Sequence, residues 1–198
     1  MELEKQPRNL FFIRPRRFGK SIFLSMLHSY YDCNQSAKFQ SLFGKLWIGQ
    51  HPTELQGKYQ VLFLDFSQVS GNIDSLERNF DFYCSVKLDG FMRRYGESYS
   101  EETREKVRKA EYAMDKLAFI HDEAEQKGFS LYLIVDEYDN FTNVVLNEHG
   151  EKVYHAITHA DGFYRDVFKK FKGNFERIFM MGVSPVTLDD VTSGYNVG

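Results

Sequence analysis

The stretch Arg14-Pro15-Arg16-Arg17-Phe18-Gly19-Lys20-Ser21 decides the fold. It follows an apolar run at 10–13, and a helical pattern of apolar residues begins directly after it. A buried strand, a tight loop ending in Gly-Lys-Ser and a helix together bind phosphate, because backbone N–H groups and the positive end of the helix face the anion. In such a loop Lys20 would reach the terminal phosphates, and the Ser21 hydroxyl would bind Mg²⁺.

One position of this stretch departs from the general P-loop pattern. The pattern G-x-x-x-x-G-K-[ST] has a glycine where this chain has Arg14, and Pro15 makes the loop stiffer. The arginines of the loop add positive charge, which compensates in part. We predict that the nucleotide is held by Arg16, Arg17, Phe18, Gly19, Lys20, Ser21 and Ile22. The alternative is a Gly-Lys-Ser tripeptide that stands at a helix start by chance.

Composition and charge narrow the class of protein. The 198 residues suit a single domain, and no segment has the layout of a membrane span or a signal peptide, so we expect a cytoplasmic protein without a membrane partner. Cys33 and Cys84 are too few for a disulfide framework. The net charge of −3 argues against a general nucleic-acid-binding surface, although residues 1–21 carry six lysines and arginines against two glutamates.

Strands alternate with helices along the chain. Apolar runs predict strands at 10–13, 61–66, 131–137 and 178–183, and periodic apolar residues predict helices at 22–30, 39–48, 73–91, from Ser100 to Gly128, and at 153–171. This order implies parallel pairing through right-handed crossovers. The expected fold is an α/β three-layer sandwich of the P-loop type with a mostly parallel central sheet.

Two acids end the strand at 131–137. Buried carboxylates are costly without a partner, so Asp136 and Glu137 should emerge at the strand end beside a cation or water. In a nucleotidase the aspartate helps to hold Mg²⁺ opposite Ser21, and the glutamate polarises the attacking water. The alternative is a structural pair of carboxylates that caps the next turn.

Three further candidates are weaker. Ser184 follows the last strand and could hydrogen-bond a γ-phosphate or the attacking water, as a sensor residue does; it could equally be a turn serine. Asp65 ends the strand at 61–66, as a site residue or as a strand-end cap. His155 and His159 are spaced as metal ligands on a helix, but the glutamate of a zinc protease motif is missing.

Three stretches together resemble one family. Arg14 to Ser21, Val135-Asp136-Glu137-Tyr138-Asp139-Asn140 and Gly182-Val183-Ser184-Pro185-Val186-Thr187 are similar to the signatures of bacterial AAA-ATPase-like proteins. The resemblance runs from Leu10 to Asn196, and an arginine at the first P-loop glycine is normal in that family. It implies Walker A residues Lys20 and Ser21, Walker B residues Asp136 and Glu137, and Ser184 near the sensor position.

The resemblance also implies parts that residues 1–198 would lack. Family members continue into a last core strand, a helical lid and a PD-(D/E)XK nuclease-like domain. We therefore expect one AAA-ATPase-like P-loop domain that is C-terminally truncated. An arginine finger would then come from a lid or from a neighbouring subunit.

Four hypotheses remain open. The leading one is a domain that binds ATP with Mg²⁺, hydrolyses it, and drives or gates a nucleic-acid-processing partner domain, with Glu137, Lys20 and Ser184 as catalytic residues. The second is a nucleotide-binding regulatory module without turnover. The third is a nucleic-acid-binding module that uses the basic N-terminal stretch. A phosphate-transferring kinase is the fourth, although adjacent acids suit water activation better.

Overall fold

The computed structural model describes residues 2–15, 19–69, 73–140, 162–183 and 196–197. Its strands are β1 (Asn9–Ile13), β2 (Tyr59–Asp65), β3 (Ser130–Asp136), β4 (Arg177–Gly182) and β5 (Asn196–Val197). Its α-helices are α1 (Glu2–Lys5), α2 (Lys20–Tyr31), α3 (Phe39–Phe43), α4 (Trp47–Gln50), α5 (Ile73–Tyr95), α6 (Glu101–Lys109), α7 (Ala113–Lys127) and α10 (Phe163–Asn174). The predicted strands are therefore confirmed within two residues at each end.

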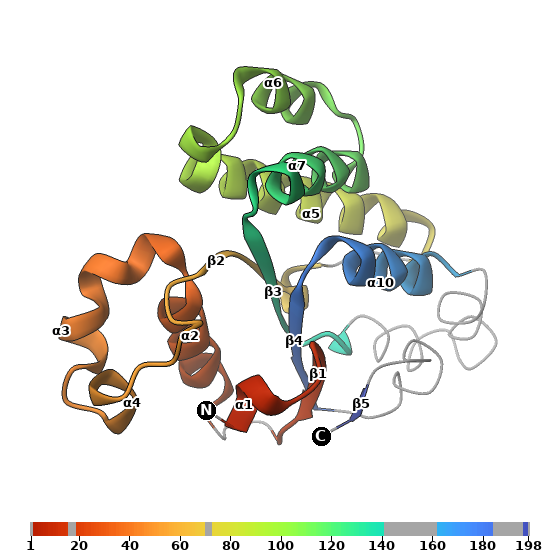
Figure 1. Cartoon of the computed structure of the whole chain (residues 1–198). Coiled ribbons are helices and arrows are strands. Elements are labelled where there is room, and N and C mark those ends of the chain that lie inside the picture. The colour runs from red at the N-terminus through yellow and green to blue at the C-terminus, as the bar shows by residue number, and fades with distance from the viewer. Residues whose placement is uncertain (1, 16–18, 70–72, 141–161, 184–195, 198) are drawn as a thin grey trace.

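The five strands form one parallel sheet in the order β2-β3-β4-β1-β5 (Figure 1). This confirms the predicted parallel sheet. In the register of the strands, Asp65 lies beside Asp136, Asp136 beside Met181, and Ile13 beside Gly182. The carboxyl ends of four strands thus meet at one edge, which is where ligands bind in open α/β sheets.

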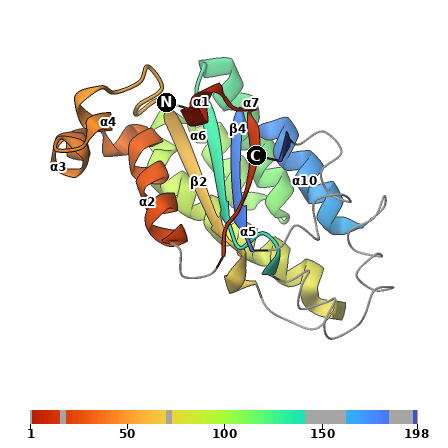
Figure 2. The same ribbon diagram turned by 90° about the horizontal axis from the view of Figure 1, so that it is seen from below.

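Helices cover both faces of the sheet, which makes a three-layer sandwich (Figures 1 and 2). The strand β3 shows how the sequence divides the core, because successive side chains of a strand point to opposite faces. Its residues Leu131, Leu133 and Val135 pack with α5, α7 and α10. Its residues Tyr132 and Ile134 pack with α2 and α3 on the other face. Both faces of the strand are apolar, as expected for a parallel strand that is covered on both sides.

Two of the predicted helices are each broken into two. The helix expected over 39–48 is α3 followed by α4, and the helix expected between Ser100 and Gly128 is α6 followed by α7. The second break follows from a contact with α5, since the Asp81 carboxylate accepts a hydrogen bond from the first N–H of α7 (2.9 Å). Both predicted ends of this helical segment are confirmed. Ser100 caps α6 by accepting the Thr103 N–H, and Gly128 ends α7 in a left-handed conformation.

None of the helices in the described part of the chain is both long and apolar enough to cross a bilayer.

Candidate functional site

The loop before α2 ends at Gly19, whose backbone is left-handed. Gly19 adopts φ 70, a left-handed conformation that favours glycine, and its carbonyl accepts the Phe23 N–H at 3.0 Å in the first turn of α2. Lys20 and Ser21 are then the first two residues of α2. The other predicted loop residues, Arg16, Arg17 and Phe18, lie outside the described residues.

Lys20 is the most informative side chain of the site. It is 8% exposed, and its Nζ makes no hydrogen bond to any described residue. Its ion pair with Glu137 is long, with 3.7 Å between Nζ and Oε1. Burying an ammonium group is costly unless it is paired and hydrogen-bonded. Lys20 is therefore electrostatically suited to an anion at the start of α2, where the helix dipole also favours negative charge.

Asp136 ends β3 and is nearly buried, with 9% of its surface exposed. Burial raises the pKa of its carboxyl above the ordinary value, the positive charge of Lys20 opposes this shift, and the carboxylates of Asp65 and Glu137 add to it. The Glu137 N–H donates a hydrogen bond to Asp136 Oδ1 at 2.9 Å. The sheet edge thus holds two further acids and a lysine close enough to Asp136 to influence the pKa of its carboxyl.

Glu137 has an unusual backbone for a residue with a side chain. Its φ is 50, in the left-handed region that L-residues other than glycine, asparagine and aspartate rarely adopt. Such conformations cost on the order of 1–3 kcal/mol and persist where the surroundings determine them. Its side chain is 31% exposed, so the carboxylate that faces Lys20 also reaches solvent.

Asp65 lies beside Asp136 but is engaged in its own turn. Its carboxylate accepts hydrogen bonds from the Ser67 N–H (3.0 Å), the Ser67 hydroxyl (2.7 Å) and the Gln68 amide (3.1 Å). These contacts begin the short 3₁₀-helix η2 (Phe66–Gln68). The geometry therefore favours the strand-end cap, one of the two roles that the sequence left open for this residue.

Of the remaining predicted residues, the structure describes Ser21 and Ile22. Ser21 is exposed at the start of α2, and Ile22 is 70% exposed. Ser184, which would follow β4 at the same edge, lies outside the described residues, as do His155 and His159.

A turn after β3 contains residues to which the sequence alone assigned no role. Tyr138 and Asp139 are almost fully buried, with exposures of 1% and 2%, and Asp139 Oδ2 accepts the Val183 N–H at 3.1 Å. The signal that could have found Asp139 is its charge, because a third acid within four residues of a buried strand needs a partner.

Metal ligands are sparse at this edge. Among the residues that the structure describes, no group of three His, Cys, Asp or Glu side chains could hold a metal ion. Mg²⁺ in nucleotide sites is bound by one or two protein groups together with phosphates and water, so it needs no preformed cluster. The carboxylate of Asp136 beside the buried Lys20 ammonium fits that donor set.

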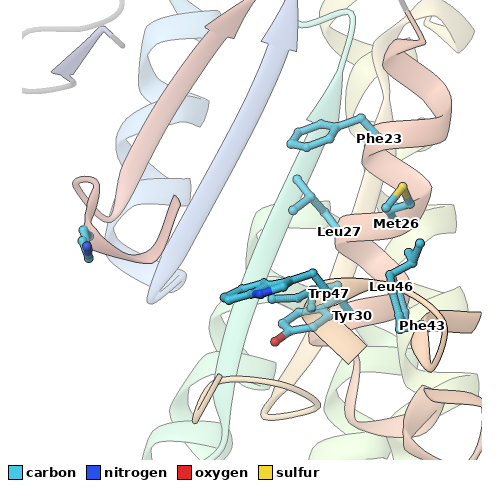
Figure 3. Close-up of a pocket in the computed structure, with 9 residues that line it drawn as sticks. Phe23, Met26, Leu27, Tyr30, Phe43, Leu46 and Trp47 are labelled. Atoms are coloured by element: carbon cyan, nitrogen blue, oxygen red, sulfur yellow. The ribbon is translucent and has the colours of Figure 1, made fainter. Parts of the chain in front are cut away.

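A large apolar cavity lies elsewhere, between α2 and the segment that contains α3 and α4 (Figure 3). It has a volume of about 670 Å³ and is lined by Lys5, Phe23, Met26, Leu27, Tyr30, Phe43, Leu46, Trp47 and Ile48. None of these residues belongs to the predicted site. An apolar wall offers few groups that could bind a triphosphate, so this cavity does not fit the nucleotide.

One comparison with known proteins, the one with family models, found a match, and the matched family is consistent with the loop and the sheet described above. No curated protein and no solved structure matches the chain significantly. A family model described as a predicted AAA-ATPase matches residues 1–192, almost the whole chain. The chain has an α/β sandwich with a parallel sheet, a Gly-Lys-Ser helix start and two acids at the end of a neighbouring strand, and it belongs to the AAA-ATPase-like family.

Proposed function

We propose that this domain binds ATP with Mg²⁺ at the start of α2 and hydrolyses it. The observation that carries the proposal is the Lys20 ammonium, which is buried at a helix N-terminus without a hydrogen-bond partner among the described residues. A triphosphate would supply the missing acceptors, and the helix dipole would favour its charge. Membership of the AAA-ATPase-like family supports nucleotide binding independently.

The residues at this edge of the sheet would have separate roles in nucleotide binding and hydrolysis. Lys20 and the N–H groups that begin α2 would bind the phosphates, with Arg16, Arg17 and Phe18 in the loop before them. Ser21 and Asp136 would hold Mg²⁺, which neutralises charge on the phosphates. Glu137 would accept the proton of the attacking water, and Ser184 would hydrogen-bond the terminal phosphate.

A second candidate function is nucleotide binding without turnover. The ion pair between Glu137 and Lys20 favours it, because a glutamate that faces the lysine is not yet placed beside an attacking water. In either case we propose, from the resemblance, that the domain gates a nuclease-like domain in a longer protein. Contact with nucleic acid would then be indirect.

Calorimetry with ATP in the presence and absence of Mg²⁺ tests nucleotide binding. We expect Lys20→Ala to weaken ATP binding roughly 10- to 100-fold, since a hydrogen-bonded charge contributes about 1.5–3 kcal/mol. Lys45→Ala, which removes an exposed lysine, is the matched control and should bind as the wild type does. Equal affinity of the two variants would show that the phosphate loop is assigned wrongly.

Phosphate release separates the two acids. We expect Asp136→Asn to reduce Mg²⁺-dependent binding, and Glu137→Gln to retain binding while losing hydrolysis. A Glu137→Gln protein with full turnover would mean that another residue orients the water. A wild-type protein that binds ATP and releases no phosphate would favour the second candidate function.

A further inference from the structure

The turn after β3 is held by the end of β4 through one buried carboxylate. Asp139 is 2% exposed, and its Oδ2 accepts the Val183 N–H at 3.1 Å. A hydrogen bond to an ionised acceptor is stronger than one between neutral groups, and more so away from water. Asp139 therefore joins the turn that carries Glu137 to the segment directly after β4.

The packing around Gly182 shows how close this contact is. A Cβ atom at Gly182 would lie 2.5 Å from Tyr138 Cε1 and 2.7 Å from Asp139 Oδ1. Such distances lie well inside van der Waals contact, so only glycine fits at the end of β4. The Gly182 carbonyl in turn accepts the Arg14 N–H at 3.0 Å. The turn is thus connected through β4 to the residue that begins the phosphate loop.

Other contacts fix the same turn from further sides. The Tyr138 N–H donates to the Met181 carbonyl (3.4 Å), and the Tyr164 hydroxyl of α10 donates to the Tyr138 carbonyl. The Tyr138 ring packs edge-on against Phe11 of β1, with centroids 5.2 Å apart. The Asn140 N–H closes the turn by donating to the Glu137 carbonyl at 2.9 Å.

These contacts account for the left-handed backbone of Glu137. A residue at φ 50 keeps this conformation only where the chain on either side is fixed. On the N-terminal side β3 is held in the sheet, and on the C-terminal side Asp139 is held by Val183. The backbone conformation that sets the position of the Glu137 side chain therefore depends on the chain being anchored at Asp139.

We propose that Asp139 is a positioning residue that holds Glu137 beside the start of α2 by binding the Val183 N–H. The inference rests on the proposed function, since it concerns the geometry of the same site. Asp139 would touch neither nucleotide nor metal. Its loss should lower turnover and leave nucleotide affinity nearly unchanged, because Lys20 and Ser21 lie on α2.

The kinetic test compares Asp139→Ala with Asp139→Asn, which keeps an oxygen that can accept the Val183 N–H. We expect kcat to fall at least tenfold in Asp139→Ala with KM within about threefold of the wild type, and to recover in part in Asp139→Asn. Asp115→Ala, which removes an exposed aspartate of α7, should match the wild type. A change in KM alone would overturn the proposal.

A double-mutant cycle asks whether Asp139 acts through Glu137. If it does, Asp139→Ala should lower the residual turnover of Glu137→Gln by a much smaller factor than it lowers the turnover of the wild type, since there is then no catalytic carboxylate to misplace. Equal effects in the two backgrounds would indicate a merely structural role and would overturn the proposal.

Amide hydrogen exchange tests the same contact without turnover. We expect faster exchange at Val183 and Asn140 in Asp139→Ala, recovery in Asp139→Asn, and unchanged exchange at Leu133 in the middle of β3. Unchanged exchange at Asn140 would overturn the proposal even in a protein that does not hydrolyse ATP. A separate result would show that the proposed function itself is wrong. In that case Lys20→Ala would bind nucleotide as the wild type does.

Discussion

At the scale of the residue, the site combines a buried cation with a strained acid. Lys20 lacks hydrogen-bond partners among the described residues, and Glu137 holds a backbone conformation that its side chain disfavours. Both features cost free energy in the folded state, and both lie at the edge of the sheet where we propose that the nucleotide binds. Strain of this kind is common at functional sites, where the rest of the structure compensates for it.

The strain at Glu137 can be measured by comparing two small residues at that position. We expect Glu137→Gly to be more stable than Glu137→Ala by about 1 kcal/mol, because only glycine adopts φ 50 without a steric cost. The same pair at Glu77, an exposed position within α5, should show the opposite order, since glycine is the poorer helix former. Chemical denaturation of the four variants decides it. The same order at both positions would show that Glu137 is not strained.

At the scale of the element, the end of β4 depends on close packing against the turn after β3. We expect Gly182→Ala to destabilise the protein by roughly 1–3 kcal/mol, because its Cβ would overlap Tyr138 and Asp139. Gly173 in α10 has nothing within 4 Å of an added Cβ, so Gly173→Ala should be neutral or slightly stabilising. Thermal unfolding of both variants checks this. A neutral Gly182→Ala would mean that the turn readily moves aside.

The junction of α6 and α7 carries a predicted pH dependence. Burial raises the pKa of Glu123, but hydrogen bonds from Lys127, Thr103 and Ser100 outweigh burial and lower the pKa to about 2. The ionised Glu123 carboxylate therefore stabilises the folded state fully above pH 4.5, the ordinary pKa of a glutamate. This stabilisation is lost as the pH falls towards 2.

Glu123→Gln tests that pH dependence. We expect it to cost roughly 1–2 kcal/mol at pH 7, allowing for solvent screening at the half-exposed Lys127, and less at pH 3. Urea denaturation of wild type and variant at the two pH values measures both differences. A difference that stays constant from pH 7 to pH 3 would contradict the lowered pKa.

At the scale of the whole molecule, nucleotide binding at the proposed site would be coupled to folding, because that site is assembled from the ends of different strands. The proposed phosphate loop follows β1, the two acids lie at the end of β3, and Val183, which anchors their turn, follows β4. A site assembled in this way exists only in the folded chain. A nucleotide bound there must therefore stabilise the fold.

Thermal unfolding with and without nucleotide measures this coupling. At 100 times its Kd, ATP with Mg²⁺ should stabilise the fold by about 2.7 kcal/mol and raise Tm by roughly 5–10 °C. Lys20→Ala should lose most of this shift at the same concentration. An equal shift in both proteins would place the nucleotide away from Lys20.

Local patterns were sufficient for the strands and for the start of the site. Five apolar residues before Asp136 indicated a strand covered on both faces, and Gly19 before Lys20 indicated a helix start that faces an anion. Both features depend on neighbours within a few residues. For that reason the parallel sheet, the α/β layers and the edge that carries Asp136 and Glu137 could be predicted from the sequence alone.

Only the tertiary structure decided the features that join distant segments. The order of the strands, the break before α7 at Asp81, and the anchoring of Asp139 by Val183 all join residues more than 30 positions apart. Periodicity carries no information about such pairs, because it reports which face of an element is apolar and not which partner covers it. The sequence by itself thus determined the elements and the chemistry at their ends. Packing between distant elements decided how Lys20, Asp136 and Glu137 are held.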